Sequence, residues 1–99
     1  MPRVMFTISY GIKPEQRENY LSLISEIKNH MVNVGKKNYS VFEVMGKKNQ
    51  FAEVYFFNSE EEFDALDDNQ DEQTQELLSK LEGVIDDGGM KYTSTVEVP

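Results

Sequence analysis

Hydrophobic residues recur along this chain with two different periods, two residues in four stretches and about 3.6 residues in the others. From Arg3 to Tyr10, hydrophobic Val4, Phe6 and Ile8 alternate with Met5, Thr7 and Ser9, which predicts a half-buried β-strand. The same period of two predicts further strands over Tyr39 to Met45, Phe51 to Phe57 and Met90 to Val98.

A helical period separates these strands. Hydrophobic side chains at intervals of four, three, four and three predict one helix from Pro14 to Val34: Tyr20, Ile24, Ile27, Met31 and Val34. Ser59 and Glu62 form a capping-box pattern, which predicts a short helix carrying Phe63 and Leu66. After the polar run Asp67 to Asp71, a second hydrophobic stripe resumes from Thr74 to Ile85 and predicts a packed helix.

The resulting order, β-α-β-β-α-β, predicts an α+β ferredoxin-like domain over residues 1 to 99, with a four-stranded antiparallel sheet and both helices on one face. We expect strands one and three at the centre, parallel to each other. The helices are expected to cover Val4, Phe6, Ile8, Phe42, Val44, Val54 and Phe56. The far face would then carry Met5, Val41, Met45, Phe51, Tyr55 and Phe57, which predicts a homodimer formed through this sheet face.

Charge and composition narrow the classes of partner. Eighteen acidic and ten basic residues give a net charge of −8, which disfavours nucleic acid and anionic membranes as partners. The absence of cysteine excludes disulfides, a thiolate nucleophile and Cys-ligated metals. No apolar run reaches the roughly 20 residues that span a bilayer, and the N-terminus lacks a signal-peptide pattern, so we expect a soluble cytoplasmic protein.

Two stretches resemble a known group of proteins. Gly11 to Tyr20 resembles the exit of the first strand into a charged helix start, and Glu53 to Phe63 resembles a third strand with an aromatic end and a Ser/Glu-rich cap. Both are similar to stretches of the dimeric α/β-barrel superfamily, in particular the antibiotic-biosynthesis monooxygenases and related haem-degrading oxygenases. The resemblance implies a ferredoxin-like subunit that forms a dimeric barrel and a monooxygenase-like activity.

The chain departs from that group at three positions. Many members have a tryptophan where Phe57 stands, and a histidine in the region of Leu66 to Asn69, which contains none here. Haem-degrading members have an asparagine in the first strand, and Arg3 to Tyr10 contains none. Haem degradation is therefore disfavoured, and we expect no cofactor. A cofactor-independent oxygenase needs only a polarising hydrogen bond and a dry pocket.

Three residues are candidates for chemistry. His30 is the only histidine, and histidine is the side-chain type best suited to proton transfer near neutral pH, although a partly exposed histidine at a helix end explains it more simply. Tyr10 and Tyr92, with Tyr20 as a further option, could place hydroxyls between sheet and helices to bond a phenol- or quinone-like ligand. Core tyrosines with satisfied hydroxyls are the alternative interpretation.

The acidic residues suggest two further hypotheses, a calcium site and a pair of glutamates in the hairpin. Asp67, Asn69 and Asp71 have the alternate spacing of a calcium loop but lack its glycine and terminal acid, so a solvated acidic face is favoured. Glu43 and Glu53 could face each other across the hairpin, on the far face, as a pair of carboxylates for acid–base chemistry, although a structural role is favoured. There, Arg3 and Lys91 would be their ion-pair partners and would fix the dimer register.

The sequence therefore supports two functions. The first is a homodimeric, cofactor-independent monooxygenase acting on a small aromatic or quinone-like molecule, with Tyr10, Tyr92 and His30 orienting it and moving protons. The second is a non-catalytic dimer on the same fold that binds or regulates through a small molecule. Fold alone does not decide between them.

Overall fold

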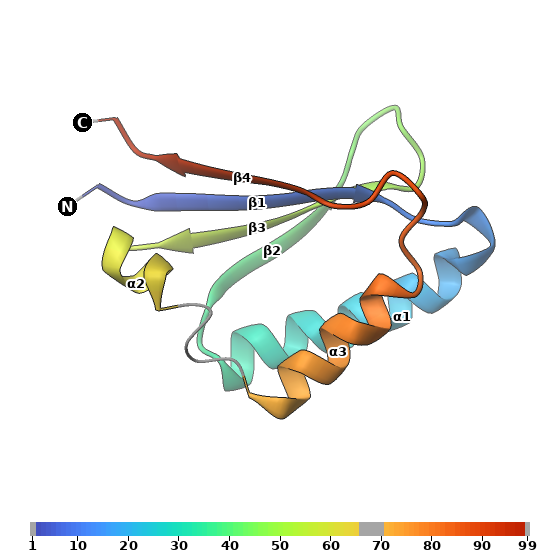
Figure 1. Cartoon of the computed structure of the whole chain (residues 1–99), viewed down its shortest axis with the longest axis horizontal. Helices are drawn as coiled ribbons and strands as arrows, with labels where there is room; N and C mark the ends of the chain where they lie inside the picture. The colour runs from blue at the N-terminus through green and yellow to red at the C-terminus, as the bar shows by residue number, and fades with distance from the viewer. Residues whose placement is uncertain (1, 66–70, 99) are drawn as a thin grey trace.

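The computed structural model describes residues 2–65 and 71–98. Along the chain these residues form β1 (Val4–Gly11), a 3-10 turn η1 (Pro14–Gln16), α1 (Arg17–Asn29), a π-helical turn η2 (His30–Val34), β2 (Asn38–Glu43), β3 (Gln50–Phe57), α2 (Glu60–Asp64), α3 (Glu72–Glu82) and β4 (Lys91–Val96). Figure 1 shows the four strands as one layer, with α1 and α3 side by side on one of its faces. The predicted α+β ferredoxin-like fold is confirmed.

The sheet has the order β2-β3-β1-β4, and every neighbouring pair is antiparallel. The prediction that β1 and β3 are central is confirmed, but the prediction that they are parallel is wrong. The crossover through α1 returns the chain so that β2 runs in the direction of β1, and the hairpin after β2 then reverses β3.

The predicted inner face of β1 is confirmed, whereas the faces of β3 and β2 are the reverse of the prediction. Val4 lies opposite Phe57, Phe6 opposite Tyr55 and Ile8 opposite Glu53, so these side chains share the face that the helices cover. The buried core accordingly includes Val4, Tyr10, Tyr39, Phe51, Tyr55 and Phe57. The predicted inner residues Phe42, Val44 and Phe56 lie on the outer side instead and are exposed.

The error follows from the composition of β3. This strand is hydrophobic at both odd and even positions, so alternation alone does not say which side faces the helices. A change of face moves every side chain of a strand at once, and here it brings Glu53 into the interior.

Local signals at the helix ends are largely confirmed. The helix predicted from Pro14 to Val34 exists, and its last turn widens into η2, where the amide of Gly35 donates to the carbonyl of His30 at 3.0 Å. Ser59 caps α2 by accepting from the amide of Glu62 at 3.2 Å. Leu66 and the Asp67 to Asn69 spacing lie outside the described residues.

The charged pairs also differ from the prediction. Arg3 pairs with Glu97 at 3.0 Å and Arg17 with Glu43 at 2.7 Å, so Arg3 is not the partner of Glu43 or Glu53. Glu43 lies opposite Phe51, not opposite Glu53. The proposed role of Arg3 and Glu53 in fixing a dimer register is therefore wrong, because Glu53 faces the helices. Within the described ranges, no helix has the length and hydrophobicity to cross a membrane.

Candidate functional site

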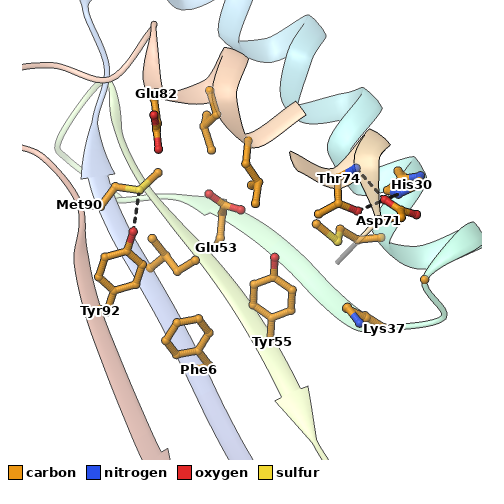
Figure 2. A pocket seen from close by; sticks show the side chains of 15 residues that line it. Phe6, His30, Lys37, Glu53, Tyr55, Asp71, Thr74, Glu82, Met90 and Tyr92 are labelled. Carbon is orange, nitrogen blue, oxygen red and sulfur yellow. Dashed lines mark hydrogen bonds and ion pairs between the residues drawn. The ribbon is translucent and has the colours of Figure 1, made fainter. Parts of the chain in front are cut away.

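A pocket of about 250 Å³ lies between the inner face of the sheet and the helices. Its floor comes from β1 and β3, its roof from η2 and α3, and one side from Met90 and Tyr92 at the start of β4. Figure 2 shows Glu53 and Tyr55 in the middle, with Glu82, Met90 and Tyr92 towards one end and His30, Asp71 and Thr74 towards the other. The pocket therefore joins apolar walls to several polar groups.

Glu53 is the most unusual of these groups. Its side chain comes from the central strand β3 and is only 1% exposed. Its Oε1 accepts a hydrogen bond of 2.5 Å from the buried hydroxyl of Tyr39 on β2. Its Oε2 is buried and has no hydrogen-bond partner among the described residues. In Figure 2 the carboxyl group points into the pocket.

Burial raises the pKa of the Glu53 carboxyl, because a charge is costly away from water, and the hydroxyls of Tyr39 and Tyr10 oppose this by lowering it. Burial, followed by the nearby charge of Glu53, raises the pKa of the Tyr39 hydroxyl, so that phenol keeps its proton and donates it. A raised pKa brings a carboxyl closer to the range in which general acid–base groups work best.

Tyr10 lies between the sheet and α1, as predicted, but it does not line this pocket. Its hydroxyl is 2.8 Å from that of Tyr20, and both rings are buried. Burial and then the charge of Glu53 raise the pKa of Tyr10. The Tyr10 hydroxyl therefore keeps its proton, and it lowers the pKa of the Glu53 carboxyl.

His30 begins the π-helical turn and is only 3% exposed, so the prediction of a partly exposed histidine is wrong. The helix end that carries it is covered by α3. Its Nε2 lies 2.9 Å from Thr74 Oγ1 and 3.2 Å from Asp71 Oδ1. Because an ionised carboxylate only accepts, Nε2 carries the proton in this contact. Nδ1 is buried without a partner in the part of the chain that the structure describes.

Asp71 and Thr74 also hold the start of α3. Asp71 Oδ1 accepts from the amide of Thr74 at 2.7 Å, which is a helix N-cap. The hydroxyl and amide of Thr74, followed by His30, lower the pKa of Asp71. His30 therefore connects the end of the α1 segment to the cap of α3 while lining the pocket.

Tyr92 lines the pocket at its edge and is 62% exposed. Its ring stacks on that of Phe6, with centroids 6.0 Å apart and an interplanar angle of 13°. Its hydroxyl donates to Met90 Sδ at 3.1 Å. Together these residues give the pocket a flat aromatic wall that is open to solvent.

Sequence reasoning missed Glu53 and Tyr39 as site residues. The available signal was a lone acid in the most hydrophobic strand, in the same alternating set as Phe51, Tyr55 and Phe57. Burying an acid among aromatic side chains is costly unless the acid is paired or neutral, so an acid at such a position is a candidate functional residue. No group of three or more metal-ligating side chains is placed to hold a metal ion among the residues that the structure describes.

The sequence matches no protein-family model and no curated protein. Solved structures with the same fold include a conserved protein from Methanosarcina mazei Go1, with a TM-score of 0.83 and 12% identity over 99% of this chain and 95% of that one. A second is described as an antibiotic biosynthesis monooxygenase, with a TM-score of 0.79 and 15% identity over 97% and 99% of the two chains.

A third is a variant of SnoaB of Streptomyces nogalater, described as a cofactor-independent oxygenase. Its TM-score is 0.71 and its identity 10%, over 94% of this chain and 90% of that chain. At these identities the similarity concerns the fold. The predicted resemblance to antibiotic-biosynthesis-monooxygenase-like proteins is confirmed at that level.

Proposed function

We propose that this protein oxygenates a small phenol- or quinone-like molecule without a cofactor, with Glu53 as the group that takes the substrate proton. The observation that carries this proposal is the buried, unpartnered Oε2 of Glu53, which lines an otherwise mainly apolar pocket. A buried carboxyl whose pKa is raised, in a cleft, is a common feature of functional sites.

The pocket selects for size and shape. Its volume is about 250 Å³, whereas ordinary small-molecule sites begin at about 300 Å³. A pocket of this size fits a ligand with a single ring or two fused rings. Phe6, Tyr55 and Tyr92 supply aromatic surface on which a flat ring can lie.

The chemistry needs no electrons beyond those of the substrate. Glu53 Oε2 removes the phenolic proton, and the electron-rich ring anion that results transfers electrons to dioxygen and forms a carbon–oxygen bond at a ring CH. Protonated Glu53 returns its proton to the peroxide anion that forms, and the resulting hydroperoxide loses water to leave a carbonyl. One atom of dioxygen enters the product and the other leaves as water. The attacked ring carbon is oxidised from CH to C=O. The original phenolic oxygen becomes the second carbonyl oxygen of the quinone. The low polarity of the pocket strengthens each hydrogen bond made during these steps.

The three residues expected from the sequence have distinct places in this proposal. His30 and Tyr92 line the pocket, and we propose that they contact the ligand at opposite ends. Tyr10 lies outside the pocket and lowers the pKa of Glu53 through its hydroxyl. The activity by which SnoaB is described, on a fold that this chain shares, supports the reaction class.

Oxygen uptake tests the proposal. Wild-type protein is incubated with a panel of dihydroxybenzenes, dihydroxynaphthalenes and phenols that carry a conjugated carbonyl. Dissolved oxygen and product mass are followed, with labelled dioxygen to trace the incorporated atom. We expect Glu53→Gln to lower kcat/KM by about 100-fold or more, since general acid–base groups contribute at that level. Glu43→Gln, which changes an acid of β2 outside the pocket, is the matched control and should leave the rate unchanged.

The competing function is a binding protein without catalysis. It predicts that members of the panel bind, as measured by calorimetry, while no oxygen is consumed by the wild type. Equal oxygen uptake by wild type and Glu53→Gln would instead reject the assigned role of Glu53.

We also propose that a second copy of the chain covers the outer face of the sheet. Met5, Phe42 and Phe56 on that face are exposed, with Phe42 at 57%, and a hydrophobic patch of this kind is typical of an interface. Sedimentation should give a dimer for the wild type and a monomer for Phe42→Glu. A monomeric wild type at micromolar concentration would reject this proposal.

A further inference from the structure

Lys37 is the one lysine or arginine that lines the pocket among the described residues. It follows the π-helical turn, and its amide donates to the carbonyl of Met31 at 2.9 Å, which fixes the backbone there. The side chain is half-buried. Its ammonium group forms no ion pair within the described part of the chain, so it is available to a ligand.

Figure 2 places Lys37 at one end of the pocket, on the same side as Asp71 and Thr74. Glu82 and Met90 lie at the opposite end, with Glu53 and Tyr55 between. A flat ligand that reaches from Glu53 to Lys37 would therefore lie across Tyr55. Its two ends would meet a proton acceptor and a cation.

We propose that Lys37 binds a second oxygen of the substrate, one that is conjugated through the ring to the hydroxyl that Glu53 deprotonates. The inference rests on the proposed function of this pocket and narrows its substrate class to acidic phenols that carry a conjugated carbonyl or comparable oxygen group. When the proton moves from the phenol oxygen to Glu53 Oε2, the negative charge spreads to the second oxygen. Lys37 then donates a charge-assisted hydrogen bond to it.

The negative charge around the pocket makes Lys37 important for binding an anionic ligand. The chain carries a net charge of −8, and Asp71 and Glu82 also line the pocket, so an anion is disfavoured there without local compensation. At physiological salt, the interaction between two exposed charges is largely screened when they are more than about 8 Å apart. An ion pair between a ligand and a half-buried lysine is screened much less. The Lys37 contact therefore decides whether a phenolate is accepted.

The experiment uses 4-nitrophenol, because its phenolate absorbs visible light and its nitro oxygens are conjugated with the hydroxyl. Binding and ionisation of this probe are followed by absorbance across a range of pH with wild type, Lys37→Met, Lys37→Arg and Lys36→Met. Lys36 is exposed, adjacent and absent from the pocket, so Lys36→Met makes the same change in net charge without touching the site.

We expect wild type to bind the phenolate in preference to the phenol and to lower the apparent pKa of the probe. Lys37→Met should weaken phenolate binding by about tenfold, Lys37→Arg should retain most of it, and Lys36→Met should match wild type. Equal effects of Lys37→Met and Lys36→Met, or no binding of the probe by wild type, would overturn the assignment. Because no oxygen chemistry is measured, phenolate binding without oxygen uptake on the panel would reject the oxygenase and leave the role of Lys37 standing.

Discussion

His30 and Glu53 are both buried titratable residues that line one pocket, but they are built into the protein in different ways. His30 contacts Asp71 and Thr74, which cap α3, so its hydrogen bonds join two helical segments. Glu53 has one bond, to Tyr39, and its other oxygen has no partner among the described residues. The first arrangement supports the fold, whereas the second lowers stability whenever the carboxyl is ionised.

The difference separates a structural polar group from a functional one. Hydrogen bonds that tie one element to the cap of another give rigidity, as around His30. Nδ1 of His30 also lacks a partner among the described residues, but it is an uncharged nitrogen when Nε2 alone carries a proton. Glu53 Oε2 shares a full negative charge once the carboxyl ionises, so a ligand that supplies the missing contact gains most there.

The largest effect on stability is expected from His30, the residue whose hydrogen bonds support the fold. His30→Ala removes a buried ring and its bonds to the α3 cap, so we expect the free energy of unfolding to fall by about 2 to 4 kcal/mol. Urea denaturation monitored by circular dichroism measures this. If His30→Ala is as stable as wild type, the contacts of His30 do not support the fold and the comparison fails.

A smaller effect is expected from Tyr39, whose hydroxyl donates to Glu53 Oε1. Tyr39→Phe removes the hydroxyl that favours the carboxylate, so the pKa of Glu53 should rise further and leave less of the base ionised at neutral pH. The rate of oxygenation at neutral pH should fall about tenfold and recover at higher pH.

Tyr20→Phe is the control for that experiment, because it removes an equally buried hydroxyl that bonds Tyr10 and not Glu53. Its pH profile should move much less than that of Tyr39→Phe, because the Tyr20 hydroxyl reaches Glu53 only through Tyr10. A Tyr39→Phe profile that is lower at every pH by the same factor would indicate a loss of structure and would reject the positioning role of Tyr39.

The sequence predicted the order of elements, both helix starts and the central strands because each rests on local periodicity or capping, as Ser59 with Glu62 illustrates. It failed where the outcome depends on pairing across the sheet. The register of Ile8 with Glu53, and of Tyr39 with Tyr55, is set by contacts between distant segments.

The candidate site was predicted only in part for the same reason. Tyr92 and His30 both line the pocket, but the helical stripe predicted a partly exposed His30, and its burial depends on its contacts with Asp71 and Thr74. The sequence pattern puts Glu53 on the outer face, because β3 is hydrophobic on both sides and its alternation does not show which side faces the helices. The signal for an inward-facing Glu53 was its place in the same alternating set as the aromatic residues Phe51, Tyr55 and Phe57 of β3.

The central claim is that Glu53 serves function and does not stabilise the fold. The most direct test compares the free energy of unfolding of wild type and Glu53→Gln across a range of pH. The folded pKa of Glu53 is raised above the ordinary glutamate value of 4.5, so its stability contribution is complete below that value and is lost as pH rises through the folded pKa. Glu43, whose pKa Arg17 lowers to about 2, and other paired acids are common to both proteins and cancel in the difference.

The two proteins should be equally stable at about pH 4. As pH rises, Glu53→Gln should become the more stable one, by at most about 1.4 kcal/mol for each pH unit between the unfolded and folded pKa of Glu53. A difference that stays at zero, or a Glu53→Gln protein that is less stable at about pH 8, would contradict the account and place Glu53 among the residues that hold the fold.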